Sequence, residues 1–147
     1  MITSSISDLS SALKKGVETN INNNSPVRII SKASSFWNMF GGCTSYEGMD
    51  MDIDVSSSTH FHSMFLGCTN FNSPNVVDWQ IGSKGAPVQT YFMFSECPKF
   101  NQDISGWDTT GVDRIDHMFK GASIFDQDLS AWDISDVTAT LSELFTD

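Results

Sequence analysis

Pairs of adjacent apolar residues, Met followed by Phe, recur along this chain at a nearly constant spacing. They begin at residues 39, 64, 93 and 118, and a degenerate copy, Leu144-Phe145, lies close to the last residue. The steps between successive copies are 25, 29, 25 and 26 residues. This period predicts a repeat architecture, because one unit cannot bury its apolar side alone and packs against copies of itself.

Other apolar positions keep the same phase. A small residue follows each Phe of the pair by three positions, an aromatic residue by six, and Ile or Trp by thirteen or fourteen. We therefore expect equivalent residues to form rows, spaced by the roughly 4.8 Å that separates paired strands. The rows expected to form a structural ladder are Phe40, Phe65, Phe94 and Phe119; Cys43, Cys68 and Cys97; Phe71, Phe100 and Phe125; and Trp79, Trp107 and Trp132.

The repeated motif resembles that of a known family. Residues 100–108 are Phe-Asn-Gln-Asp-Ile-Ser-Gly-Trp-Asp, and residues 125–133 are Phe-Asp-Gln-Asp-Leu-Ser-Ala-Trp-Asp. With the preceding Met-Phe pair, this pattern resembles the BspA-like leucine-rich-repeat surface proteins. The resemblance covers residues 36–147 and is weaker in the first two copies, where Ile53 replaces the Trp and residues 82–86 are additional. It implies a leucine-rich-repeat-like solenoid, a surface or binding role and no enzyme.

We therefore predict an α/β repeat solenoid, a leucine-rich-repeat-like stack of about four coils with an N-terminal helix and strand as its cap. The units are expected near residues 36–60, 61–89, 90–114 and 115–140, with a terminal half unit at 141–147. The Met-Phe segments are expected to form a short helix or 3₁₀ turn, and the Trp segments with the following Val a brief strand or extended segment. Residues 82–87 are rich in Gly and Pro and are expected to bulge from one side, which in repeat proteins often marks the binding side.

We expect a helix followed by a strand in residues 1–35, the segment before the repeats. A β-branched run at residues 27–30 predicts the strand. Two interpretations stay open for this segment: it caps the open end of the repeats, or it anchors the chain on a partner. The helix is expected to carry one apolar face, because Ile6, Leu9, Leu13 and Val17 recur at helical spacing. If the segment anchors the chain, this face would contact the partner.

Charge narrows the range of partners. Residues 1–35 hold four basic and two acidic side chains, a net charge of +2, whereas residues 36–147 hold four basic and sixteen acidic side chains, a net charge of −12. An acidic surface lacks the basic face that phosphate requires, so we expect no nucleic-acid binding. No window approaches the roughly 20 apolar residues of a membrane span, so we expect no membrane insertion. No signal peptide is visible in residues 1–16.

Sulfur and acidic side chains are the candidates for metal or redox chemistry. The three cysteines share one repeat position, and we expect free, buried thiols in a row rather than a disulfide. No Cys-x-x-Cys pair suggests zinc. Aligned acids could bind a cation such as Ca²⁺, but carboxylates that cap turns are the favoured interpretation. The weak calcium candidates are Asp103, Asp108, Asp128 and Asp133, and we expect no metal and no cofactor.

Catalytic motifs are not evident, and we expect no catalytic residue. His60, His62 and His117 could form a metal pair or a pH switch, but surface histidines are favoured. The Trp row at residues 79, 107 and 132 could form an exposed strip for stacking on sugars, but packing in the core is favoured. An enzyme needs one irregular site with groups in distinct environments, whereas the acids here recur in register.

These observations favour a non-enzymatic structural or interaction protein. We expect a component of a virion, such as a phage tail or capsid decoration, or of a cell surface. Its partner would be a protein, a surface receptor or glycan, or another virion subunit. The alternatives are a fragment of a bacterial surface adhesin and, less favoured, an enzyme that acts on polysaccharide from a repeat scaffold.

Overall fold

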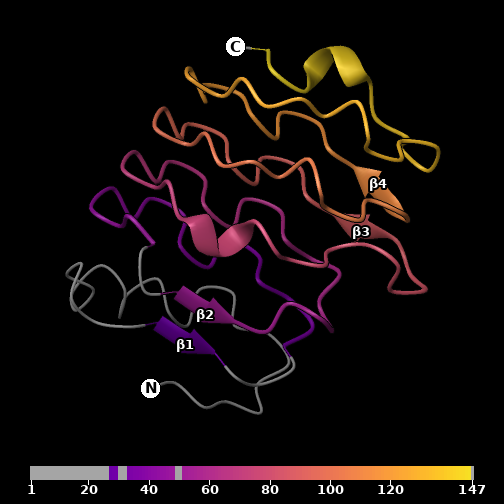
Figure 1. Ribbon diagram of the computed structural model, residues 1–147, viewed down its shortest axis with the longest axis horizontal. Coiled ribbons are helices and arrows are strands. Elements are labelled where there is room, and N and C mark those ends of the chain that lie inside the picture. Colours follow the sequence, from indigo (N-terminus) through magenta and orange to yellow (C-terminus); the bar gives the residue numbers. More distant parts are fainter. Residues whose placement is uncertain (1–26, 30–32, 49–50, 147) are drawn as a thin grey trace.

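The computed structural model describes residues 27–29, 33–48 and 51–146. Its strands are β1 (Val27–Ile29), β2 (Met51–Ile53), β3 (Val88–Gln89) and β4 (Val112–Arg114), and its two 3₁₀ turns are η1 (Pro74–Val76) and η2 (Leu141–Glu143). Figure 1 shows the chain running from the indigo strand β1 at one end of the molecule to the yellow turn η2 at the other. Most of the described chain between these elements consists of turns and loops.

The predicted α/β repeat solenoid of the leucine-rich-repeat kind is wrong. The described residues contain no α-helix, and the strands form two separate two-stranded parallel sheets, β1 with β2 and β3 with β4. The short helix or 3₁₀ turn expected at each Met-Phe pair is instead a series of turns. The strand expected near residues 27–30 is present as β1, whereas the N-terminal helix and its apolar face, Ile6, Leu9, Leu13 and Val17, lie outside the described residues.

Backbone hydrogen bonds join segments about one repeat apart in the sequence. The N–H of each Phe in a Met-Phe pair donates to the carbonyl of the Met in the next pair: Phe40 to Met64 at 2.9 Å, Phe65 to Met93 at 3.0 Å, and Phe94 to Met118 at 3.0 Å. Phe119 donates in the same way to Leu144 of the degenerate copy, at 3.0 Å. The repeated pairs therefore lie side by side in sequence order, although few of their residues adopt extended strand conformation.

A left-handed residue before each Met explains why no helix forms there. Asn38, Ser63, Phe92 and His117 have φ angles of 52°, 58°, 56° and 54°. A residue with this conformation interrupts both an α-helix and a continuous strand. The backbone N–H groups of these segments then form two kinds of hydrogen bond in alternation. One N–H donates to a carbonyl in the same turn, and the N–H of the following residue donates to a carbonyl of the next repeat.

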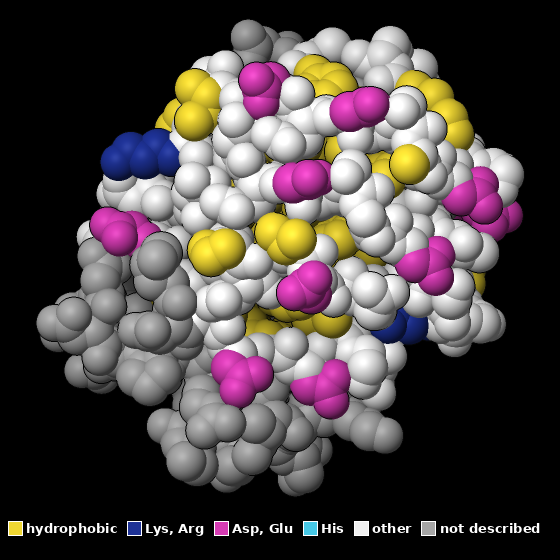
Figure 2. All heavy atoms as spheres, viewed as in Figure 1, with side chains coloured by type: hydrophobic (Ala, Val, Ile, Leu, Met, Phe, Trp, Pro, Cys, Tyr) yellow, Lys and Arg dark blue, Asp and Glu magenta, His cyan; other side chains and the backbone are white. Residues whose placement is uncertain are grey.

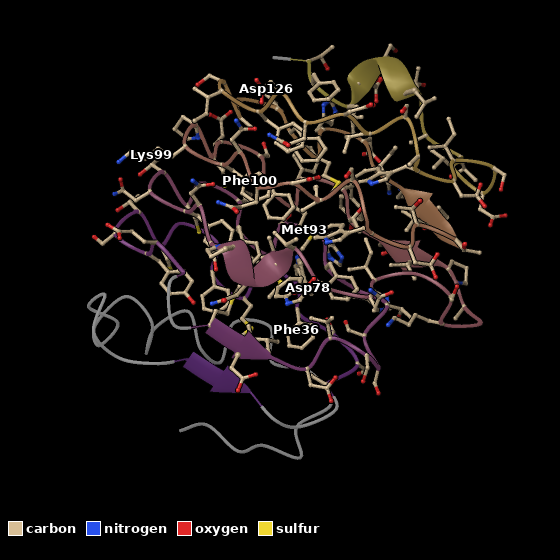
Figure 3. The ribbon with its side chains drawn as sticks, viewed as in Figure 1. Phe36, Asp78, Met93, Lys99, Phe100 and Asp126 are labelled. Carbon is tan, nitrogen blue, oxygen red and sulfur yellow. The ribbon has the colours of Figure 1, made fainter. Side chains whose placement is uncertain are left out.

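The core is built from aromatic rings that stack from repeat to repeat. Ring centroids are 5.3 Å apart for Phe40 and Phe65, 5.6 Å for Phe65 and Phe94, and 6.0 Å for Phe94 and Phe119. A second row links Phe71 to Phe100 at 6.0 Å and Phe100 to Phe125 at 5.7 Å. Figure 3 shows Phe100 and Met93 inside the fold, whereas Lys99 points outward. No helix in the described part of the chain has the length and apolar character of a membrane span.

Candidate functional site

The Trp row predicted from the repeats is buried. Trp79, Trp107 and Trp132 are 6%, 3% and 8% exposed. The ring of Trp107 stacks on that of Trp132 at 6.2 Å, and the contact of Trp79 is with Phe65 at 6.2 Å. The indole N–H of Trp107 donates to the carbonyl of Val76 at 2.8 Å, and that of Trp132 donates to Ile104 at 3.0 Å. These rings fill the core and offer no face to a sugar.

The three cysteines are buried and form no disulfide. The thiol of Cys68 donates to the carbonyl of Phe40 at 2.9 Å, and that of Cys97 donates to Phe65 at 3.0 Å. Burial raises the pKa of Cys97 to about 12 and also raises the pKa of Cys68. Because the thiolate is the reactive form, these side chains act as small apolar residues and not as nucleophiles.

The acidic residues considered for calcium cap turns. Each of the four carboxylates accepts a hydrogen bond from the backbone N–H two residues later, at 2.9 to 3.1 Å. Hydrogen bonds lower the pKa of each carboxyl. The largest contribution comes from the Ser105 hydroxyl at Asp103, from the Ser83 hydroxyl at Asp108, and from the backbone N–H two residues later at Asp128 and Asp133. No cluster of three His, Cys, Asp or Glu side chains suited to a metal occurs among the described residues. The four carboxylates are Asp103, Asp108, Asp128 and Asp133.

A different set of rings forms a stack that reaches the surface. Trp37, which is 46% exposed, stacks on His62 with ring centroids 5.5 Å apart, and His62 stacks on Tyr91 at 4.6 Å. The guanidinium of Arg114 lies 4.3 Å from the centroid of the Tyr91 ring and is held by a bidentate pair with Asp116 at 2.8 and 3.0 Å. The rings of Trp37 and Tyr91 cover the faces of His62, and His62 and the guanidinium of Arg114 cover those of Tyr91. Among the described residues of this stack, Trp37 therefore offers a partner the most ring surface.

An open groove of about 490 Å³ lies beside this stack. Its volume falls within the range of about 300–1,000 Å³ that is usual for small-molecule sites. We call this hollow the aromatic groove. Its lining combines aromatic, hydroxyl and charged side chains: Trp37, His62, Ser63, Leu66, Tyr91, Phe92, Ser95, Glu96 and Lys120.

Two of the lining residues depart from the repeat at strained positions. Glu96 has a φ of 57° at a position that is Gly in the other three units: Gly42, Gly67 and Gly121. Phe92 has a φ of 56° at a position that is Asn, Ser or His elsewhere. A left-handed conformation costs a residue other than Gly about 1–2 kcal/mol. Strain of this kind concentrates at binding and catalytic sites, which directs attention to the aromatic groove.

The groove carries no net charge at neutral pH. Among the described residues the carboxylate of Glu96 has no hydrogen bond or ion pair, and neither has the ammonium group of Lys120. Burial lowers the pKa of His62, and His60 and Arg114 lower it further, so this imidazole is neutral at pH 7. One acid and one base therefore face the groove, each free to bind a ligand.

Trp37, Phe92 and Glu96 were not among the candidates expected from the sequence. Trp37 lies outside the phase of the other three Trp residues. Phe92 comes directly before the pair Met93-Phe94, at a position that is Asn, Ser or His in the other units. The signal that could have found Glu96 is the pattern Phe-x-Gly before each small residue, which Glu96 alone breaks. Of the histidines singled out, His62 lies in the ring stack and His117 stacks on Phe92 at 4.8 Å, whereas His60 lies in the parallel bridges to Ser35 and Gln89.

A second hollow of about 510 Å³ lies at the insert, residues 83–87, where the sequence analysis expected a binding side. The insert is held by Ser83, whose N–H donates to Thr110 at 2.8 Å and whose hydroxyl donates to Asp108 at 2.6 Å. Asp113 and Asp136 also line this hollow, and no aromatic side chain of the described residues does. It therefore lacks the ring faces on which a ligand could stack in the aromatic groove.

The fold and the groove define a protein of tandem repeats whose surface has a hollow of ligand size. The sequence matches the family described as Mycoplasma protein of unknown function, DUF285, over residues 7–92 and again over residues 34–147. The chain therefore belongs to this family. Comparison with curated proteins and with solved structures gave no significant match.

Proposed function

We propose that the protein is a non-enzymatic interaction protein, displayed on a cell surface or a virion, that holds its partner in the aromatic groove. The observation that carries this proposal is the groove itself, which aromatic side chains and two charged groups without a hydrogen bond or ion pair among the described residues line together. Large rings supply contact area at little cost in conformational entropy, and a few polar groups supply orientation.

The acidic charge of the chain supports a protein that does not associate with its own copies. Figure 2 shows acidic side chains spread over the face that carries η1, with Lys and Arg only toward its edges. The net charge of −10 opposes packing of one copy against another and keeps the chain soluble. The resemblance of residues 100–108 and 125–133 to BspA-like surface proteins supports display at a surface.

The groove does not favour the alternative of a polysaccharide-cleaving enzyme. Glycoside hydrolysis generally uses two carboxyl groups, about 5–5.5 Å apart in retaining enzymes and about 6.5–9.5 Å apart in inverting ones. Of the described residues that line the groove, Glu96 is the single acid. A single carboxylate beside aromatic rings suits recognition better than hydrolysis.

Antibody labelling of the native source tests the proposed location. We expect a specific antibody to label intact cells or particles, and we expect trypsin added to intact cells to remove the label. Labelling that appears only after permeabilisation would contradict display at a surface. An internal protein of the same source, probed in parallel, controls for leakage.

A further inference from the structure

The strained residues Phe92 and Glu96 depart from the repeat at adjoining places on one groove. In the preceding unit the equivalent positions hold Ser63 and Gly67, so the third unit replaces a small polar residue with a ring and a glycine with a carboxylate. The ring contacts of Phe92 are with Tyr91 at 6.1 Å and with His117 of the following unit at 4.8 Å. On the side of the preceding unit its counterpart is Ser63, whose short side chain cannot cover an aromatic ring.

We propose that the aromatic groove binds a neutral pyranose sugar of a partner glycan, with the sugar against the ring of Phe92 and its hydroxyl groups bonded to the carboxylate of Glu96. This inference rests on the proposed interaction role and names the chemistry of the ligand. A pyranose presents an apolar face of C–H groups and a rim of hydroxyl groups. The groove presents the complement, with the rings of Trp37 and Phe92 and the edge of Tyr91 as apolar surface and Glu96, Lys120 and Ser63 as polar groups.

The charges of the groove favour a neutral ligand over an ionic one. Glu96 accepts hydrogen bonds and Lys120 donates them, so together they match hydroxyl groups, which do both. A cationic ligand would meet Lys120 and would find the Tyr91 face already occupied by Arg114, whose charge Asp116 balances. An anionic ligand would meet Glu96 and the net charge of −10.

The repeat supplies variants that keep the backbone plausible while removing each group. Phe92→Ser installs the residue of the preceding unit, and Glu96→Gly installs the residue of the other three units. Glu96→Gln keeps a hydrogen-bonding side chain and removes the charge. Ile124→Ala is the matched surface control, because Ile124 is 54% exposed and does not line the groove. Thermal unfolding of each variant, followed by circular dichroism, verifies that it is folded.

The test is a binding assay of the full chain against a panel of immobilised oligosaccharides. The panel contains neutral chains ending in glucose, galactose, mannose or N-acetylglucosamine, together with sialylated and sulfated chains and an arginine-rich peptide. We expect saturable binding to at least one neutral chain and none to the charged probes. We expect Phe92→Ser and Glu96→Gly each to weaken binding by about tenfold or more, which corresponds to about 1.4 kcal/mol. Glu96→Gln should weaken it less, and Ile124→Ala should leave it unchanged.

Three results would overturn the inference. They are no binding to any neutral chain, undiminished binding by folded Phe92→Ser and Glu96→Gly, and a preference for the arginine-rich peptide or for anionic chains. The surface role is judged separately, by antibody labelling of intact cells or particles. If the protein is surface-displayed but binds no neutral sugar, the glycan inference fails and the proposed function stands. If the protein is found only inside cells, the proposed function fails even where the sugar binds.

Discussion

Replacing Phe94 with Ala tests the aromatic packing that holds the repeats together. Phe94 is fully buried, and its ring packs against aromatic rings of its own repeat and of both neighbouring repeats. Its ring centroid lies 4.0 Å from that of Phe100, 5.6 Å from Phe65 and 6.0 Å from both Phe119 and Trp107. Removal of the ring leaves a cavity between three repeats that cannot all collapse toward it.

The expected cost is near the upper end of the range of about 3–5 kcal/mol for Phe→Ala in a core. The matched control is Phe145→Ala, because Phe145 is 54% exposed and stacks on Phe119 at 5.5 Å from one side. It should cost about 1 kcal/mol, the size of one aromatic pair. Urea unfolding followed by circular dichroism measures both variants. With a slope of about 2 kcal/mol per molar urea, the midpoint should fall by about 2 M for Phe94→Ala and about 0.5 M for Phe145→Ala.

A difference of less than about 1 kcal/mol between the two variants would refute this reasoning, because the central ring would then contribute no more than a peripheral one. If Phe94→Ala does not fold, Phe94→Leu takes its place. This milder change keeps most of the volume and should cost about 1.5 kcal/mol or less. A Phe94→Leu variant that is less stable than Phe145→Ala would still support the ranking.

Three further predictions concern the cysteines, His62 and the left-handed position of Glu96 and Gly67. Titration of the native protein with a thiol reagent should be slow, and titration after unfolding without reductant should find the three free thiols of Cys43, Cys68 and Cys97, whereas one thiol would reveal a disulfide. The lowered pKa of His62 keeps its ring neutral in the fold, so the stability it contributes is present above about pH 6.5 and is lost as the pH falls toward the lowered pKa. Melting temperatures should accordingly fall less between pH 7 and pH 5 for His62→Phe, which keeps the stack, than for the wild type, and equal falls would contradict this. Glu96→Gly should leave the chain as stable as the wild type or up to about 1 kcal/mol more stable, because Gly adopts the left-handed conformation without strain. Gly67→Ala should destabilise the chain by about 1 kcal/mol for the same reason. Urea unfolding measures both variants, and the opposite order of stability would show that neither position is strained.

The repeat phase carries much of the information on which side chains are neighbours. Phe71, Phe100 and Phe125 are separated by 29 and 25 residues, and their rings stack in that order. The phase does not carry the backbone conformation between them. Asn38, Ser63, Phe92 and His117 share one left-handed conformation. Asn and His adopt it more readily than most residues but Ser and Phe do not, so the four positions carry no common signal in the sequence. The short helix or 3₁₀ turn predicted at each Met-Phe pair was therefore wrong.

The candidate site was harder to predict because it consists of departures from the repeat. The search for recurring residues led to Trp79, Trp107 and Trp132, which recur because they fill the core. Trp37 and Glu96 recur nowhere, and a search for periodicity passes over such residues. The residues that recur in every unit are those that pack one unit against the next. A binding site formed by one or two units is expected at residues that do not recur.

The most direct test of the aromatic groove is a nuclear magnetic resonance titration of the ¹⁵N-labelled full chain with the neutral oligosaccharides of the panel. The amide signals that move should belong to residues of the groove, above all Tyr91, Phe92 and Glu96, and the indole N–H signal of Trp37 should move while those of the three buried Trp residues stay. Signals that move instead at the insert, residues 83–87, or no movement with any neutral sugar, would contradict the assignment of this groove as the glycan-binding site.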